Sequence, residues 1–195
     1  MRCVLPALLL ARTLLATTVL ATTVLATTVL ATSLGPVLAQ TASAPPMQTF
    51  EGGVVNGRGE SIGRIAIRDG ATALVVRLVI APGGLPPGWH GIHFHAVGDC
   101  SDAGTFERSK AHVNHDQSKH GLLNPEGPDE GDLPNVYANA DGSVNAEVSS
   151  ETPLTGEGGL KDADGSALVV HANEDDHTSQ PIGGAGARIA CAVIK

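Results

Sequence analysis

Two histidines separated by a single residue most constrain how this chain can fold. His93 and His95 lie in the stretch GIHFHAVGDC, residues 91–100. In a β-strand, side chains two residues apart leave the same face, so both imidazoles would point one way and Ile92 and Phe94 the other. Such a strand offers one face to a hydrophobic core and two nitrogen ligands to a metal. The alternative is that they are two polar residues on a solvated strand face, and the histidines later in the sequence decide between these interpretations.

Short apolar runs separated by turn residues predict an all-β domain. The chain has 24 glycines and 12 prolines but only one Trp, one Tyr and three Phe, which suits many turns and an aliphatic core. Alternating and β-branched residues predict eight strands, at residues 47–55, 61–68, 72–81, 89–97, 135–140, 143–149, 166–171 and 187–194. Eight short strands predict an immunoglobulin-like Greek-key barrel or sandwich, with a long functional loop between residues 98 and 134.

The first 39 residues have the composition of an export signal. Arg2 and Arg12 are the only charges before Glu51, and an apolar Leu-Ala-Thr-Thr-Val repeat ends near a VLA sequence at residues 37–39. That pattern fits cleavage by signal peptidase, although the run is also long enough for an uncleaved membrane anchor. We expect a signal peptide over 1–39, a flexible tether over 40–46 and one domain over 47–195. The mature protein would be periplasmic or otherwise exported, without stable membrane association.

Charge and cysteine content narrow the class of function. The formal net charge is −8, and losing Arg2 and Arg12 with the signal changes it to −10. Such an acidic domain is not expected to bind nucleic acid. Cys100 and Cys191 remain after the signal is removed, and an even pair in an exported protein predicts one disulfide. Two buried free thiols are the alternative.

Further histidines and acids follow the first pair. His112 and His120 lie in the long loop, Asp129 and Asp132 follow them, and His171 ends a strand. Imidazoles suit Cu(II), and histidine with aspartate suits zinc. The number of these residues, close to strand ends and to a disulfide-tethered loop, favours a metal centre over a solvated surface.

The segments that carry these residues resemble a known family. They read GWHGIHFHAVGDC, AHVN followed by KHG, GDLPN, LVVHANEDD and GGAGARIACAVI. Together, over about residues 49–195, the chain is similar to the bacterial exported copper/zinc superoxide dismutases. The resemblance implies an enzyme that converts superoxide to dioxygen and hydrogen peroxide by alternate reduction and reoxidation of a histidine-bound copper. It implies copper and zinc as cofactors and superoxide as partner, and it leaves a monomer and a homodimer both open.

The resemblance also implies a role for each candidate residue. The positions that match copper ligands are His93, His95, His112 and His171, and those at the zinc site are His112, His120, Asp129 and Asp132. His112 would bridge the two metals and, with Arg188, take part in catalysis.

One acidic and one basic residue outside the ligand set also match the family. Asp175 matches an aspartate that links a copper histidine to a zinc histidine, expected here to be His93 and His120, and its alternative is a solvated acid. Arg188 matches an arginine that orients superoxide, with an ordinary cross-strand charge as its alternative. Alternation places Arg188 and Cys191, three residues apart, on opposite strand faces unless a bulge intervenes. His177 is expected on the surface.

Asp129 departs from the family pattern, which has a third zinc histidine nine residues after the position of His120. Three interpretations are open: Asp129 binds zinc itself, the zinc site is weakened or empty, or another histidine such as His115 takes its place. A metal-sequestering protein without activity and a purely structural β-sandwich are the competing functions. Arg188 favours the enzyme, because a sequestering site has no need of a guanidinium.

Overall fold

The computed structural model describes residues 47–195, so the predicted signal peptide and tether lie outside the described residues. The described part is built of strands and one short 3-10 helix, η1 (Glu107–Ser109). The strands are β1 (Thr49–Asn56), β2 (Ser61–Asp69), β3 (Leu74–Ile80), β4 (Gly88–His90), β5 (Ile92–His95), β6 (Val136–Ala138), β7 (Val144–Ser150), β8 (Ser166–His171) and β9 (Arg188–Ile194). The all-β class is therefore confirmed.

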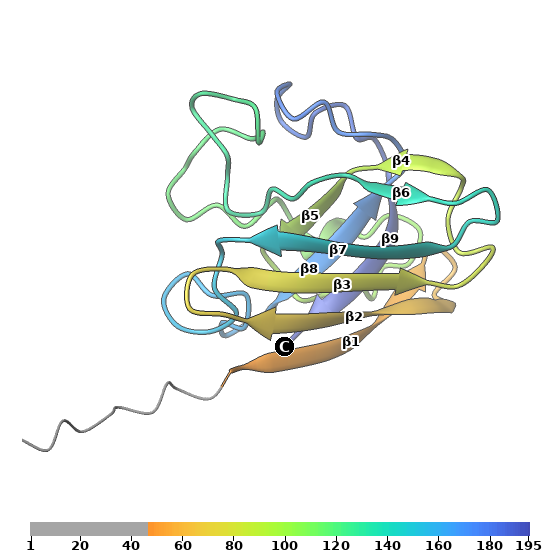
Figure 1. Ribbon diagram of the computed structural model, residues 1–195, viewed down its shortest axis with the longest axis horizontal. Helices are drawn as coiled ribbons and strands as arrows, with labels where there is room; N and C mark the ends of the chain where they lie inside the picture. Colours follow the sequence, from red (N-terminus) through yellow and green to blue (C-terminus); the bar gives the residue numbers. More distant parts are fainter. Residues whose placement is uncertain (1–46) are drawn as a thin grey trace, which may run out of the picture. The chain divides into compact units, whose positions relative to one another are not determined.

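Seven strands form one antiparallel sheet in the order β5-β8-β9-β1-β2-β3-β7, and β4 pairs with β6 in a second small sheet. Figure 1 shows β7, β3 and β2 in front and β8 and β9 crossing behind them, so the large sheet curls upon itself. Every second side chain along these strands points into the space between the two halves of the curled sheet, and these inward-facing residues are apolar. Ile65, Ile67 and Leu78 meet Ile92 and Phe94 in this core.

The histidine pair lies on the opposite face of β5 from the core. Ile92 and Phe94 are fully buried in the main core. His93 pairs with Val169 across β8, and Val169 belongs to a separate small cluster outside that core. The alternation inferred from the sequence therefore holds along β5.

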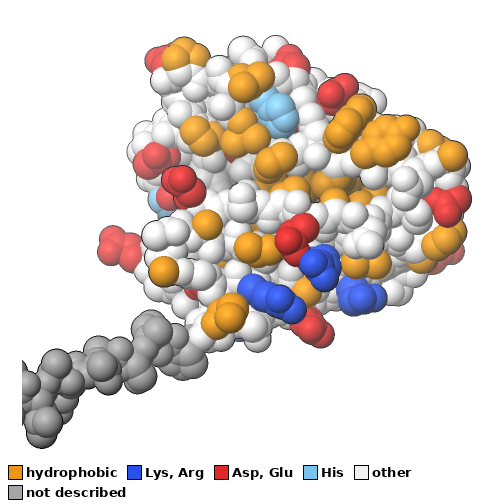
Figure 2. All heavy atoms as spheres, in the orientation of Figure 1, with side chains coloured by type: hydrophobic (Ala, Val, Ile, Leu, Met, Phe, Trp, Pro, Cys, Tyr) orange, Lys and Arg blue, Asp and Glu red, His pale blue; other side chains and the backbone are white. Residues whose placement is uncertain are grey.

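One predicted strand, residues 89–97, is divided into β4 and β5, which gives nine strands among the described residues instead of eight. The break is at Gly91, where an added Cβ would lie 3.1 Å from the Cβ of Asp175. A glycine there lets a distant loop approach, and the strand changes sheets. In the small sheet Trp89 pairs with Tyr137, their ring centroids 5.1 Å apart. Figure 2 shows hydrophobic side chains exposed at that end of the molecule.

The predicted disulfide is present. Cys100, at the start of the long loop, is bonded to Cys191 in β9, 91 residues later. Cys191 packs with Phe106 in the small cluster beside the sheet, so the bond and the phenyl ring together hold the loop on β9. Within residues 47–195, no helix has the length and apolar character to cross a membrane.

Candidate metal centre

The outer face of β5 and β8 carries three of the predicted copper ligands. Antiparallel pairing of the two strands puts His93 and His95 on the face that also bears His171. All three side chains are at most 1% exposed. One nitrogen from each lies within 4.8 Å of the other two, a spacing that a single ion could span.

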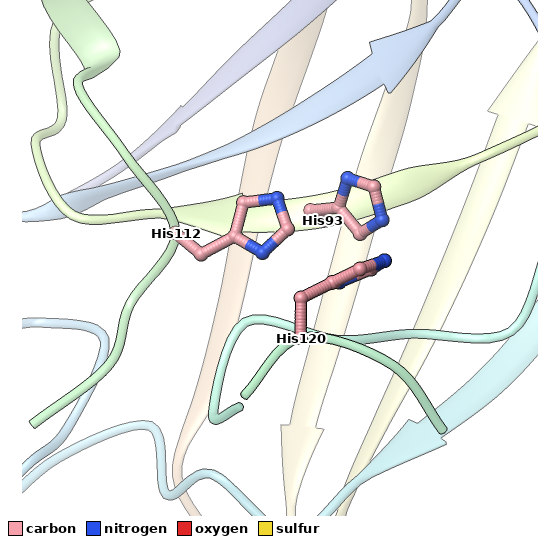
Figure 3. Close-up of side chains that lie close together, drawn as sticks. All are labelled: His93, His112 and His120. Atoms are coloured by element: carbon pink, nitrogen blue, oxygen red, sulfur yellow. The ribbon is translucent and has the colours of Figure 1, made fainter. Parts of the chain in front are cut away.

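The long loop runs back along β5 and brings in two more histidines. Phe94 N–H donates to the carbonyl of Gly131 (2.8 Å), and any side chain at Gly131 would overlap the Phe94 carbonyl. Glycine therefore permits the close approach of the loop to the strand. Figure 3 shows His112 and His120 extending from the loop toward His93 on β5.

Each copper-side ring has one nitrogen held by the protein. His95 and His171 donate from Nδ1 to backbone carbonyls, those of Lys110 (2.7 Å) and Gly186 (2.9 Å). On the four predicted copper ligands, four other buried ring nitrogens have no hydrogen-bond partner among the described residues, namely Nδ1 of His93 and Nε2 of His95, His112 and His171. Unpartnered buried polar atoms are rare in native proteins. Four on neighbouring rings match the imidazole donors that Cu(II) prefers.

Burial also keeps the rings of His95 and His171 neutral. Desolvation, with the charge of His112 as the next contribution, lowers the pKa of His95 well below its ordinary value. Desolvation and the charge of His93 lower the pKa of His171 to about 3. Because a metal binds the unprotonated imidazole, the rings are held in the form that can bind it.

The predicted zinc ligands lie on the other side of His112. Its Nδ1 is 2.9 Å from Asp129 Oδ2, and His120 Nδ1 is 2.6 Å from Asp132 Oδ1. One ligand atom from each of the four residues lies within 4.8 Å of the others, and all four are buried. Histidine nitrogen and carboxylate oxygen form the donor set that zinc takes in proteins.

The surroundings of His120 favour a positive charge in this pocket. Burial opposes a charge on the ring, but the hydrogen bonds to Asp132 and Asp175 outweigh it and raise the pKa of His120 to about 10. A divalent ion bound there would replace the proton. His115 does not approach the group: its side chain is 51% exposed and its Nδ1 contacts Glu130 (2.9 Å).

Asp175 joins the two halves, as the family resemblance implied. Its Oδ2 accepts from His93 Nε2 (2.8 Å) and its Oδ1 lies 3.2 Å from His120 Nε2. Burial disfavours the carboxylate, yet hydrogen bonds from His120 and His93 hold the pKa of Asp175 below its ordinary value. A side chain at Gly183 would overlap the carboxylate, so glycine allows the loop to close over it.

Arg188 reaches the metal-facing side because β9 contains a bulge. His171 pairs with Arg188 but the next pair uses Ala190, which leaves Ile189 as an extra residue. A bulge of this kind shifts the alternation by one position. Arg188 therefore shares a face with Cys191, whereas strict alternation would separate them.

The guanidinium of Arg188 is fixed by the disulfide-tethered loop. Its Nη1 donates to the Phe106 carbonyl (2.6 Å) and to Ser109 Oγ (3.2 Å). Ser109 is fully buried and its own hydroxyl donates to the Phe106 carbonyl (2.7 Å). The cation is thus held next to His171, its partner across the strands.

The prediction that His177 is a surface residue is wrong. Its side chain is only 17% exposed and its Nδ1 lies 3.5 Å from Asp175 Oδ2. The residue is two positions after Asp175 in a polar loop, and no local pattern distinguishes it from a solvated histidine. Proximity to an aspartate already assigned to the centre was the one available signal.

Known proteins match the described domain along most of its length. A family model described as copper/zinc superoxide dismutase (SODC) matches residues 61–194. The Superoxide dismutase [Cu-Zn] of Caulobacter vibrioides is 49% identical over 144 residues, 71% of this chain and 81% of that protein. Superoxide dismutase [Cu-Zn] 2 of Aquifex aeolicus is 39% identical over 146 residues, 73% of this chain and 84% of that protein.

Solved structures of similar proteins have the same fold as this chain. A SOD-like protein from Bacillus subtilis superimposes with a TM-score of 0.70 at 32% identity, over 74% of this chain and 97% of that chain. A Cu/Zn superoxide dismutase from Brucella abortus gives a TM-score of 0.60 at 28% identity, over 76% of this chain and 100% of that chain. With a family model covering most of the chain and relatives above 30% identity, the chain belongs to the copper/zinc superoxide dismutase family, whose cofactors are copper and zinc.

Proposed function

We propose that the protein catalyses the dismutation of superoxide to dioxygen and hydrogen peroxide. The observation that carries the proposal is the set of four unpartnered buried nitrogens on His93, His95, His112 and His171. Bound there, copper would supply one-electron redox chemistry, and zinc would supply a fixed charge beside it. The family membership supports this activity over metal sequestration.

Two side chains of the protein would act on the proton and on the superoxide anion. The ring of His112 lies beside those of His93 and His95 with Nε2 unpartnered, while its Nδ1 contacts Asp129, so a proton held at Nε2 would be placed where the reduced product needs one. Arg188 presents a fixed positive charge next to His171, which attracts and orients a small anion. The disulfide supports the proposal that the enzyme works in an exported, oxidising compartment.

Superoxide consumption by the copper-loaded protein tests this function. We expect rapid consumption with copper, none in the metal-free protein, and a rate for Arg188→Ala reduced about tenfold at low salt with a flatter salt dependence. Copper content should be unchanged in Arg188→Ala. The matched control is Arg77→Ala, because Arg77 pairs with Glu147 on exposed strands of the sheet. A copper-loaded protein that leaves superoxide untouched would support the sequestering function instead.

We further propose that Asp129 is a zinc ligand in place of the family's histidine. Its Oδ2 contacts His112 Nδ1, and its Oδ1 accepts from Gly131 N–H (3.0 Å), so the carboxylate is already oriented toward the site. Asp129 and Asp132 would give zinc two carboxylates and make the site more anionic than one with a single carboxylate.

Metal stoichiometry distinguishes this proposal from an empty zinc site. Asp129→Ala is expected to weaken zinc binding by about 100-fold while copper is retained, and Asp129→His to keep one zinc per chain. Asp116→Ala is the control, since Asp116 is exposed and contacts Ser118. Equal zinc affinity in the wild type and Asp129→Ala would exclude Asp129 as a ligand.

A further inference from the structure

His177 is held in place next to the carboxylate that joins the two metal sites. It has a left-handed backbone conformation (φ 58°), which histidine tolerates better than most residues. Its carbonyl accepts from Leu123 N–H (3.0 Å), so the loop of His120 and the loop of Asp175 meet at this residue. The ring is mostly buried between them.

Asn135 determines which ring nitrogen of His177 carries the proton. Asn135 Oδ1 accepts from Asp175 N–H (3.0 Å), and its Nδ2 donates to the Asp175 carbonyl (2.8 Å). These two contacts fix the orientation of the Asn135 amide. If the amide were flipped, its NH₂ group would face the N–H of Asp175 and its oxygen would face the Asp175 carbonyl. The second hydrogen of Nδ2 then points to His177 Nε2 (3.1 Å).

Nε2 of His177 is therefore an acceptor, and the proton of the neutral ring is on Nδ1. That nitrogen is buried and has no hydrogen-bond partner among the described residues. It lies 3.5 Å from Asp175 Oδ2. An N–H dipole this close to a buried carboxylate stabilises the negative charge, even without a hydrogen bond between the two atoms.

The orientation of Asp175 matters to both metals. Its two oxygens receive His93 Nε2 and His120 Nε2, and those contacts decide which nitrogen each ring turns toward a metal. Figure 3 shows the rings of His93 and His120 side by side with His112. A carboxylate free to rotate would release both rings.

We propose that His177 is a positioning residue of the metal centre, which acts through Asp175 to fix the ring orientations of His93 and His120. His177 N–H also donates to Asp175 Oδ1 (2.7 Å), so the backbone of this residue holds one carboxylate oxygen and its ring lies beside the other. The inference rests on the proposed function, since it assigns His93 and His120 to the two metals.

Two variants of equal shape test the inference. His177→Met and His177→Gln are both unbranched and have similar backbone preferences, but only Gln can donate toward Asp175 and accept from Asn135. The probe is Co²⁺, which has a visible spectrum, titrated into the metal-free, disulfide-bonded protein. Circular dichroism shows whether each variant is folded.

We expect Co²⁺ affinity to fall about tenfold in His177→Met, at the lower end of losses on mutating partners of metal ligands. The Co²⁺ spectrum should change with it, and His177→Gln should bind within about threefold of the wild type. Wild-type affinity and spectrum in His177→Met would overturn the proposal, and so would an equal loss in both variants, which would assign the effect to ring volume. If His177→Met does not fold, an unchanged Co²⁺ spectrum in Asn135→Ser would overturn it.

Failure of the proposed function has a different signature. In that case the copper-loaded wild type would not consume superoxide, whatever the Co²⁺ affinities of the variants. The Co²⁺ titration involves no turnover, so the two results are independent.

Discussion

Replacing His112 with alanine is expected to disrupt both metal sites at once and to reduce superoxide consumption by at least about 100-fold. Nε2 of His112 is one of the four unpartnered nitrogens on the copper side, and Nδ1 contacts Asp129 on the zinc side. Among the described residues, His112 is the one assigned as a ligand of both metals. The loss should therefore be larger than for any zinc ligand replaced alone.

The same substitution three residues later is a matched control. His115 is exposed and contacts Glu130, so His115→Ala should leave metal content and rate unchanged. Equilibrium dialysis with metal analysis, followed by the rate of superoxide decay, measures both effects. A His112→Ala protein that retains copper, zinc and the wild-type rate would contradict the assignment of His112 as the bridging residue.

Removing the disulfide is expected to lower the free energy of unfolding by about 4 kcal/mol, because the bond closes a loop of roughly 90 residues in the unfolded chain. Urea unfolding of Cys100→Ser, of Cys191→Ser and of the double variant measures it. All three remove the same cross-link, so their stabilities should agree within about 1 kcal/mol and match that of the reduced wild type.

A further effect of the cysteine variants should appear at Arg188. The Phe106 carbonyl that accepts from Arg188 belongs to the loop that Cys100 anchors. Loosening this loop should therefore slow superoxide consumption even under conditions where the protein stays folded. A reduced wild type as stable and as fast as the oxidised form would contradict both expectations.

The parts of the fold and the site that depend on the alternation of side chains along a single strand were predictable from the sequence. Alternation along β5 is a property of consecutive residues, so the sequence was sufficient to put His93 and His95 on one face and Phe94 in the core. Turn residues located most strand boundaries for the same reason. The approach of His112 to His95 depends on the long loop and came only from the family resemblance.

The features that the sequence did not reveal depend on contacts between distant segments. Gly91 divides a predicted strand because Asp175, more than eighty residues later, packs against it. Ile189 is bulged because of the ladder with β8, which no pattern within β9 indicates. His177 is mostly buried, and the loop that carries Leu123 is hydrogen-bonded to its carbonyl. Each outcome was set by packing, which overrides local preference.

The anchoring of one nitrogen on each copper-side ring has a consequence for how the protein acquires its metals. Rings that are already oriented by carbonyls and by Asp175 lose little rotational freedom when an ion arrives, so loading should require little conformational rearrangement. The metal-free protein would then have a preorganised site, and the rate of metal binding would be limited by access of the ion to that site.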